Sequence, residues 1–248
     1  MNPLPDTTND KFLGGRVIVR QSAHGFRAGL DAVMLAAAVP ARPGDEALEL
    51  GAGAGTASLC LAKRVTGLTV VGIEIDLGLA ELANRNAKEN VMDGRVSFAA
   101  SDAFDPPAAL RRSFDHVFCN PPFHGDEGQV SPDATRARAT QDSGRLAEWL
   151  TAGLKRTASG GTFTAILRAD RLGEALAALP ERGVTVFPLW PRAEVPAKRV
   201  IIHARKDIRA QLVISPGLVL HEAGGRYTEE ADAVLRGGAS LALDSRGL

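Results

Sequence analysis

Short apolar runs and amphipathic segments alternate along most of this chain. From Glu46 onward, each apolar run suits a buried strand, and the segments between the runs carry apolar residues at helical spacing. Alternating strands and helices predict a parallel sheet that is covered by helices on both faces. The predicted strands lie near residues 46–50, 68–73, 95–99, 114–119, 161–167, 184–188 and 199–205, and the predicted helices near 56–65, 77–90, 144–158 and 170–179.

The last two predicted strands depart from this alternation. Only a proline-containing segment, Trp190 to Lys198, joins them, and it is too short and irregular for a crossover helix. Strands joined in this way pair in the antiparallel sense. The sequence therefore predicts an α/β fold with a doubly wound, mostly parallel seven-stranded sheet and an antiparallel hairpin at one edge.

The two ends of the chain carry weaker patterns. Residues 1–11 are polar and contain proline, so we expect a poorly ordered lead-in, whereas residues 16–20 alternate like a short strand. Residues 212–236 predict short strand-like pieces and a final helix. Because no internal repeat or low-complexity linker is present, we expect a single domain, with residues 1–28 as lead-in and short strand and residues 29–248 as its body.

Composition narrows the class of protein. With 248 residues, 45% hydrophobic content and 29 basic against 29 acidic residues, we expect a soluble chain with a sizeable core and no overall basic character, although local basic patches stay open. Cys60 and Cys119 lie in apolar runs without metal-ligand spacing, so we expect buried reduced thiols, no metal site and a cytoplasmic protein. The start of the chain resembles no secretory signal, and the longest apolar stretch is far shorter than the about 20 residues of a membrane span.

A glycine motif follows the first predicted strand of the sheet. Residues 47–56 read Ala-Leu-Glu-Leu-Gly-Ala-Gly-Ala-Gly-Thr, which predicts a buried strand, a tight turn through Gly51, Gly53 and Gly55, and a helix start. Glycines let a ligand approach the backbone closely, and a helix start offers unpaired N–H groups. Thr56 stands where the dinucleotide fingerprint needs its third glycine, which disfavours NAD and favours an adenosine-type ligand without a pyrophosphate. A purely structural turn is the alternative.

Acidic residues follow the next two strands. In open parallel sheets ligands bind at the carboxyl ends of the strands. Glu74 ends the second strand, roughly 20 residues after the glycines, where an acid can accept hydrogen bonds from ribose hydroxyls. Asp102, after the third strand, can accept a bond from an adenine amino group, with Ile75 or Phe104 as an apolar face for the ring. Asp31, in the first turn of a helix before the glycine motif, can cap that helix or face the ligand.

Asn120, Pro121, Pro122 and Phe123 follow the fourth strand. The two prolines fix φ and remove two donors, so the carbonyl groups of Asn120 and Pro121 are rigid acceptors. An exocyclic amine or an amide nitrogen is a poor nucleophile because its lone pair is delocalised. The Asn120 side-chain oxygen and the Pro121 carbonyl can bond its hydrogens and turn the lone pair toward an electrophile. Phe123 offers a stacking face, worth about 1 to 3 kcal/mol for a base. A structural proline turn is the alternative.

With these motifs the chain resembles class I S-adenosylmethionine-dependent methyltransferases, and among them the amino-methylating group with the signature Asn-Pro-Pro followed by Phe or Tyr. The resemblance covers about residues 14 to 170. It implies S-adenosylmethionine as cofactor, no metal, and catalysis by Asn120, Pro121, Pro122 and Phe123. The cofactor-binding residues that we assign on this basis are Asp31, Glu49, Gly51, Gly53, Gly55, Glu74, Ile75, Asp102, Ala103 and Asn120.

A closer resemblance involves the segments flanking these motifs. Residues 25–31, Gly-Phe-Arg-Ala-Gly-Leu-Asp, and the tail segment 221–229 are similar to the bacterial tRNA adenine-N(6) methyltransferases that act beside the anticodon of a valine tRNA. This implies methylation of the exocyclic amine of adenine in RNA, with tRNA favoured. The same scaffold serves guanine amines in ribosomal RNA and glutamine in proteins, although residues 1–28 are too few for the N-terminal domain that a protein substrate would need. A cofactor-sensing RNA-binding protein without turnover is the non-enzymatic alternative.

Two segments are candidates for contact with a nucleic acid substrate. The long segment 124–143, which contains His124 and Arg136, directly follows the catalytic motif and is placed to close over a substrate. Residues 192–209 hold six basic residues against two acidic ones, so this strip can bind phosphates, or it is a solvated hairpin surface. From it we assign Arg192, Lys198 and Arg199 to substrate binding. The sequence does not give the oligomeric state.

Overall fold

The computed structural model describes residues 7–23, 27–122, 145–181 and 183–243. The predicted strands are all present as β3 (Glu46–Leu50), β4 (Thr69–Glu74), β5 (Val96–Ala100), β6 (Phe114–Cys119), β7 (Thr157–Arg168), β8 (Val184–Trp190) and β9 (Arg199–Arg205). Two further strands, β10 (Val213–Ile214) and β11 (Leu218–Val219), bring the sheet to nine.

The strand order of this sheet is β10-β8-β9-β7-β6-β3-β4-β5, with β11 also paired to β8. Strands β3 to β7 pair in parallel, whereas β9 is antiparallel to both β7 and β8. The prediction of a mostly parallel sheet and of antiparallel pairing between the last two long strands is therefore confirmed. The short strands β10 and β11 extend the sheet beyond β8, so that hairpin does not form its outer edge.

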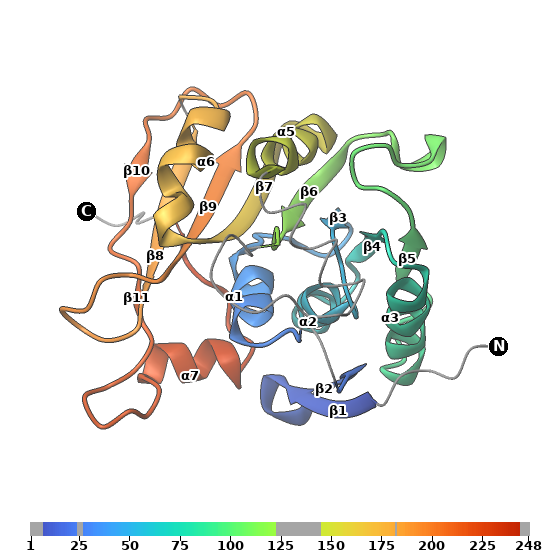
Figure 1. Ribbon diagram of the computed structural model, residues 1–248, viewed down its shortest axis with the longest axis horizontal. Coiled ribbons are helices and arrows are strands. Elements are labelled where there is room, and N and C mark those ends of the chain that lie inside the picture. Colours follow the sequence, from blue (N-terminus) through green and yellow to red (C-terminus); the bar gives the residue numbers. More distant parts are fainter. Residues whose placement is uncertain (1–6, 24–26, 123–144, 182, 244–248) are drawn as a thin grey trace.

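Helices cover both faces of the sheet (Figure 1). One face packs against α1 (Leu30–Ala38), α2 (Thr56–Arg64), α3 (Leu77–Glu89) and α7 (Glu229–Leu235), and the other against α5 (Leu146–Arg156) and α6 (Leu172–Ala178). Neighbouring residues of a strand serve opposite faces, since Ala47 belongs to the first core and Leu48 to the second. Short 3-10 turns lie at η1 (Leu13–Gly15), η2 (Ala108–Leu110) and η4 (Ala169–Arg171).

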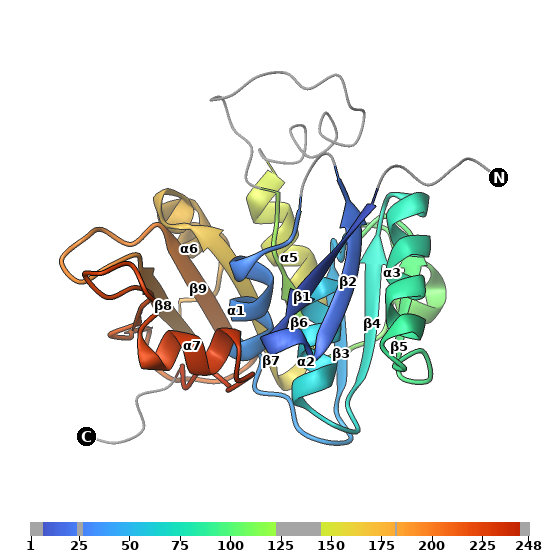
Figure 2. The same ribbon diagram turned by 90° about the horizontal axis from the view of Figure 1, so that it is seen from below.

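Two strands precede the main sheet. β1 (Thr7–Phe12) and β2 (Val17–Ser22) form a separate antiparallel hairpin, which runs beside α3 in Figure 2. The prediction that residues 1–11 are poorly ordered is thus wrong for residues 7–11. These polar residues form a strand because β2 supplies their backbone partners and because Val17 and Val19 of β2 are buried in the first core.

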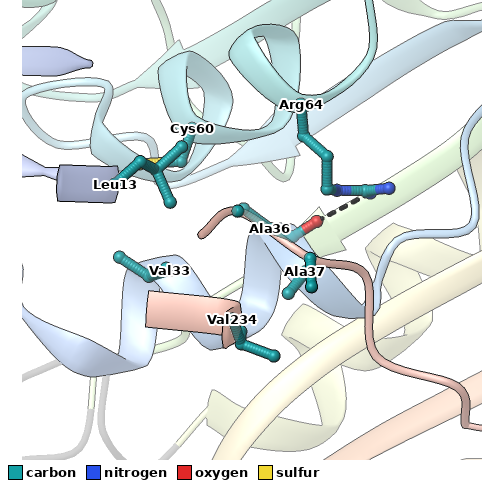
Figure 3. A pocket seen from close by; sticks show the side chains of 9 residues that line it. Leu13, Val33, Ala36, Ala37, Cys60, Arg64 and Val234 are labelled. Atoms are coloured by element: carbon teal, nitrogen blue, oxygen red, sulfur yellow. Dashed lines mark hydrogen bonds between the residues drawn. The ribbon is translucent and has the colours of Figure 1, made fainter. Parts of the chain in front are cut away.

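The helices α1 and α2 enclose a small pocket together with η1 and α7 (Figure 3). Its lining is mostly apolar, and it includes Cys60, which like Cys119 is a buried free thiol, as predicted. Arg64 at the end of α2 donates hydrogen bonds to the carbonyl groups of Ala36, at 3.0 Å, and of Val39. Since α2 begins at the glycine motif and ends here, the pocket lies toward the opposite end of the helix from that motif.

Candidate active site

The four strand ends singled out by the sequence lie side by side. Strands β6, β3, β4 and β5 are consecutive in the sheet, and Leu50 pairs with both Cys119 and Ile73. The residues that follow, Asn120, Gly51 and Glu74, therefore stand at one level across three strands. With neighbouring strands about 4.8 Å apart, the backbones at Asn120 and Glu74 are about 10 Å apart, with Gly51 between them. The fold thus brings the glycine turn, the acid and the Asn-Pro-Pro motif together.

The glycine turn uses backbone conformations that favour glycine. Gly51, Gly53 and Gly55 have φ values of 71°, 54° and 84°. The N–H groups of Gly51 and Ala52 donate to the Ile73 carbonyl at 2.8 and 2.9 Å, which fixes the turn to β4. A Cβ atom on Gly55 would lie 2.6 Å from the Phe98 ring, whereas one on Gly53 would have no neighbour within 4 Å. Packing therefore requires Gly55, and open space at Gly53 leaves room for a ligand.

The carboxylate of Glu74 faces this turn. Its Oε2 accepts a hydrogen bond from the Gly53 N–H at 2.8 Å, and its Oε1 accepts one from the Asp76 N–H at 3.0 Å. Burial raises the pKa of Glu74, and these backbone bonds oppose the rise. Each oxygen retains capacity for a further donor. Asp76 instead caps α3, with its Oδ1 accepting from Leu79 N–H at 3.0 Å, so only Glu74 of these two acids is directed at the glycines.

Glu49 lies beneath the glycine turn. Its Oε2 accepts from the N–H of Ser58 at 3.1 Å and from the Ser58 hydroxyl at 2.5 Å, which ties β3 to α2. Burial raises the pKa of Glu49 to about 8, and the negative charge of Glu74 adds to the rise, while the two bonds from Ser58 lower it. Glu49 therefore contacts the helix that follows the turn, and its carboxyl group is held in the interior.

The loop after β5 offers polar and apolar groups. Asp102 is exposed, and its Oδ1 accepts a bond from the Phe104 N–H at 2.8 Å, while Ala103 is buried. Ile75 is 53% exposed, unusual for so large an apolar side chain beside a buried strand. Phe104 packs edge to face against Trp149, with ring centroids 5.2 Å apart. Ile75 and Phe104 were both candidates to pack against the adenine ring. Ile75 is exposed, whereas Phe104 packs against Trp149 of α5.

Trp149 is a site residue that the sequence motifs do not reveal. Its ring lies so close to Gly51 that a Cβ atom there would be 3.0 Å from it. Its Nε1 is buried and has no hydrogen-bond partner among the described residues. The apolar spacing of α5 predicts a core position for Trp149, but nothing in it indicates contact with a turn roughly a hundred residues earlier.

The side-chain oxygen of Asn120 is a buried hydrogen-bond acceptor. This Oδ1 atom has no hydrogen-bond partner in the part of the chain that the structure describes, and Pro121 beside it is buried too. Leaving a buried acceptor unpaired costs about 1 to 3 kcal/mol, so a ligand that donates hydrogen bonds would be favoured here. Three further predicted residues, Phe123, His124 and Arg136, lie outside the described residues.

Asp31 and Arg199 form an ion pair. The sequence analysis assigned Asp31 to cofactor binding and Arg199 to substrate binding. The Arg199 Nε donates to Asp31 Oδ2 at 2.9 Å, which joins the start of α1 to the start of β9. Arg199 pairs in register with Arg168 at the end of β7. The ion pair therefore lies at the same edge of the sheet as Asn120.

The basic strip predicted for residues 192–209 is not one surface. Arg192, Lys198 and Arg199 precede β9 or begin it, at the edge that holds Asn120. Arg205, Lys206 and Arg209 follow at the other end of the strand, roughly 20 Å away at the rise of an extended strand. Only the first three remain candidates for contact with a substrate at this site.

The described residues hold no group of three or more His, Cys, Asp or Glu side chains placed to bind a metal ion. None of the helices described is long and apolar enough to cross a membrane.

Comparison with known proteins agrees with this geometry. Residues 27–148 match the family model of the methyltransferase small domain. The chain is 28% identical over 236 residues to a tRNA1(Val) (adenine(37)-N6)-methyltransferase of Porphyromonas gingivalis, covering 89% of this chain and 91% of the relative. A Shewanella amazonensis protein of the same name is 34% identical over 125 residues, about half of each chain (50% and 53%).

A solved structure shares the fold over most of the chain. The crystal structure of a predicted O-methyltransferase from Agrobacterium tumefaciens superposes with a TM-score of 0.72 at 27% identity. The match covers 85% of this chain and 98% of the other. The fold of this chain is therefore shared with that solved structure of a predicted methyltransferase.

The buried Glu49 predicts an unusual dependence of stability on pH. The pKa of Glu49 is raised to about 8 in the folded protein, so the folded state favours the protonated carboxyl group. The stability that this group contributes is fully present below its unfolded-state pKa and is lost as pH rises through about 8. We expect Glu49→Gln to gain stability relative to the wild type between about pH 5 and about pH 9, by on the order of a few kcal/mol. Urea unfolding measured across this range checks the prediction. A constant difference between the two proteins would contradict it, and Glu81→Gln, an exposed acid of α3, serves as control.

Proposed function

We propose that this chain, which is similar to methyltransferases, uses S-adenosylmethionine to methylate the exocyclic amine of adenine in RNA, with tRNA as the substrate. The proposed chemistry rests on the buried Oδ1 of Asn120, which has no hydrogen-bond partner among the described residues and lies at the level of Gly51 and Glu74. The proposed substrate is based on the similarity of 89% of this chain to a relative named as a tRNA adenine-N6 methyltransferase.

The residues present fit the cofactor. Glu74 would accept hydrogen bonds from the ribose hydroxyls, because its two oxygens already face the glycine turn and each can accept another donor. The open space at Gly53 allows the ligand to lie against the backbone. The exposed Ile75 would cover one face of the adenine ring, and Asp102 would accept a bond from its amino group. S-adenosylmethionine, when bound, supplies a methyl group already activated by its positively charged sulfur.

The role of the Asn-Pro-Pro motif is alignment. The Asn120 Oδ1 and the Pro121 carbonyl would accept the two hydrogens of the target amine, so that its lone pair faces the methyl group. Pro121 and Pro122 fix φ and lack N–H groups, which keeps these acceptors rigid and unshared. Alignment at near-attack distance is the main requirement of a reaction between a preactivated methyl group and a nitrogen nucleophile. The methylated nitrogen is strongly acidic and releases its proton without a dedicated base.

The substrate would extend from Asn120 along the carboxyl edge of the sheet. Arg192 and Lys198 are exposed there, and Arg199 is held by Asp31. We assign these three basic residues to the phosphates of the RNA, which fixes the orientation of the strand without reading its sequence. Phe123 as a stacking face, and His124 and Arg136 as further contacts, remain proposals from the sequence.

The decisive test of the substrate is incubation of the purified protein with methyl-labelled S-adenosylmethionine and, in separate reactions, total tRNA, ribosomal RNA, DNA and protein. We expect label in tRNA, recovered as N6-methyladenosine after digestion to nucleosides. Label only in a methylated guanosine or in glutamine would refute the adenine assignment, since the same motif serves those amines. Cofactor binding without any transfer would favour a cofactor-sensing RNA-binding protein.

Replacement of Asn120 separates binding from turnover. In the proposed arrangement Asn120→Ala removes one acceptor for the amine but no contact needed to hold the adenosine, so turnover should fall at least about a hundredfold, as for the loss of one preorganised group. Cofactor affinity should stay within about threefold of the wild type. Single-turnover rates and calorimetric titration measure the two effects. Equal loss of affinity and rate would show that Asn120 acts chiefly in cofactor binding.

The basic residues of segment 192–209 lie at two ends of β9, which allows a test of RNA contact. Lys198→Ala should reduce the dependence of RNA affinity on salt by about one unit in the plot of log K against log salt, because one phosphate contact is lost. Arg209→Ala removes an equally exposed charge beyond the other end of β9 and should leave the slope unchanged. Filter binding or fluorescence anisotropy over a salt series measures the slope. Equal effects of both variants would place the RNA elsewhere.

A further inference from the structure

The β1–β2 hairpin is docked onto α3 by asparagine side chains. The Arg20 N–H donates to Asn86 Oδ1 at 2.9 Å, and Asn86 Nδ2 donates to the Arg20 carbonyl at 3.0 Å. Asn90, one turn later, makes the same pair of bonds with Ile18, at 3.0 and 2.6 Å. A carboxamide carries a carbonyl and N–H groups like a peptide, so these two side chains take the place of a neighbouring strand along β2.

Asn86 makes one more bond, and it reaches the glycine turn. Its Nδ2 also donates to the Ala54 carbonyl at 2.9 Å, so both of its N–H groups and its oxygen are used. Asn86 has no exposed surface. Ala54 lies between Gly53 and Gly55, so the same buried side chain bonds both the hairpin and the turn that would hold the cofactor.

The bond from Asn86 reaches the turn between two glycines. Gly53 and Gly55 both have positive φ, and glycine adopts many other backbone conformations at little cost. The bonds from Ile73 and Glu74 hold N–H groups earlier in the turn, and the bond from Asn86 adds a constraint on the peptide that joins Ala54 to Gly55. Without Asn86, the Ala54 carbonyl and the Arg20 backbone groups would have to find other partners or remain unpaired in the interior.

The residue after Arg20 ties the hairpin to the segment that leads into α1. Gln21, only 2% exposed, accepts from the Ala28 N–H at 2.8 Å and donates to the Ala28 carbonyl at 3.1 Å. Its Nε2 also donates to Asp10 at 2.6 Å, and Arg27 pairs with the same carboxylate at 2.6 Å. The hairpin is thus linked through Asn86 to the glycine turn, and through Gln21 and Asp10 to the segment that leads to Asp31.

We propose that Asn86 is a positioning residue for cofactor binding, which holds the glycine turn in its binding conformation and couples that turn to the β1–β2 hairpin. The proposal rests on the cofactor site assigned above and is independent of the choice of RNA. Coupling acts in both directions, so a bound cofactor should in turn strengthen the docking of the hairpin.

Three asparagines of α3 provide matched variants. Asn90→Ala removes bonds to the hairpin and to the Asn86 carbonyl but none to the glycine turn. Asn84→Ala removes a pair of bonds to Phe98 of β5 and one to the Ala80 carbonyl. Asn86→Ala removes contacts with both the hairpin and the glycine turn. The ligand is S-adenosylhomocysteine, which lacks the methyl group and cannot react, and its affinity is measured by calorimetric titration of the full chain.

We expect Asn86→Ala to weaken this affinity about tenfold or more, which corresponds to the loss of one buried hydrogen bond to the turn. Asn90→Ala and Asn84→Ala should lower the melting temperature but leave affinity within about twofold of the wild type. If Asn86→Ala does not fold, Asn86→Ser, which leaves room for a water molecule, should show the same loss. Affinity within twofold for the folded Asn86 variant would overturn the proposal, as would an equal loss in Asn90→Ala.

Hydrogen exchange supplies a readout that a purely structural role would not change. In the wild type and in Asn90→Ala, saturating S-adenosylhomocysteine should slow exchange of the β2 amides, and in the Asn86 variant this effect should disappear. Unchanged protection of β2 in the Asn86 variant would refute the coupling. Failure of the wild type to bind S-adenosylhomocysteine would instead overturn the cofactor site itself, and the two failures are therefore distinguishable.

Discussion

The register of four parallel strands is the constraint on which the site depends. Because β6, β3, β4 and β5 pair without offset at their carboxyl ends, Asn120, Gly51 and Glu74 stand at one level. Each of these residues ends or follows a strand whose positions are mostly buried and mostly apolar, and the burial of both faces of these strands fixes the register. The chemistry of the site is therefore set by the core of the sheet rather than by the loops alone.

The glycine turn has a flexible backbone that hydrogen bonds from its neighbours hold in one conformation. Its N–H groups are held by the Ile73 carbonyl and by Glu74, and its Ala54 carbonyl is held by Asn86. Beneath it, Glu49 is buried against Ser58 with its pKa raised. A turn with three positive φ values thus keeps one shape because β4 and α3 bond to it, and the same residue of α3, Asn86, also bonds the N-terminal hairpin. The turn can therefore present its open position at Gly53 to a ligand.

The seven long strands, their direction and the alignment of their ends could be predicted because hydrophobic periodicity and the rules of parallel sheets determine them. The strand at residues 7–12 could not, since its polar residues owe their conformation to β2. Sequence proximity also misled us for residues 192–209, which β9 divides between two edges of the sheet. Trp149 contacts Gly51 and Asn86 contacts Ala54 because of tertiary packing. The spacing of residues in the sequence does not predict these contacts.

We propose that the carboxyl ends of β3, β4, β5 and β6 together hold the cofactor and direct it toward Asn120. A crystal structure of the protein with S-adenosylhomocysteine would show this arrangement. We expect ribose hydroxyls bonded to Glu74, the adenine ring against Ile75 and beside Asp102, and the sulfur atom on the side of Asn120. A ligand bound away from Gly53, or a sulfur atom pointing away from Asn120, would contradict it.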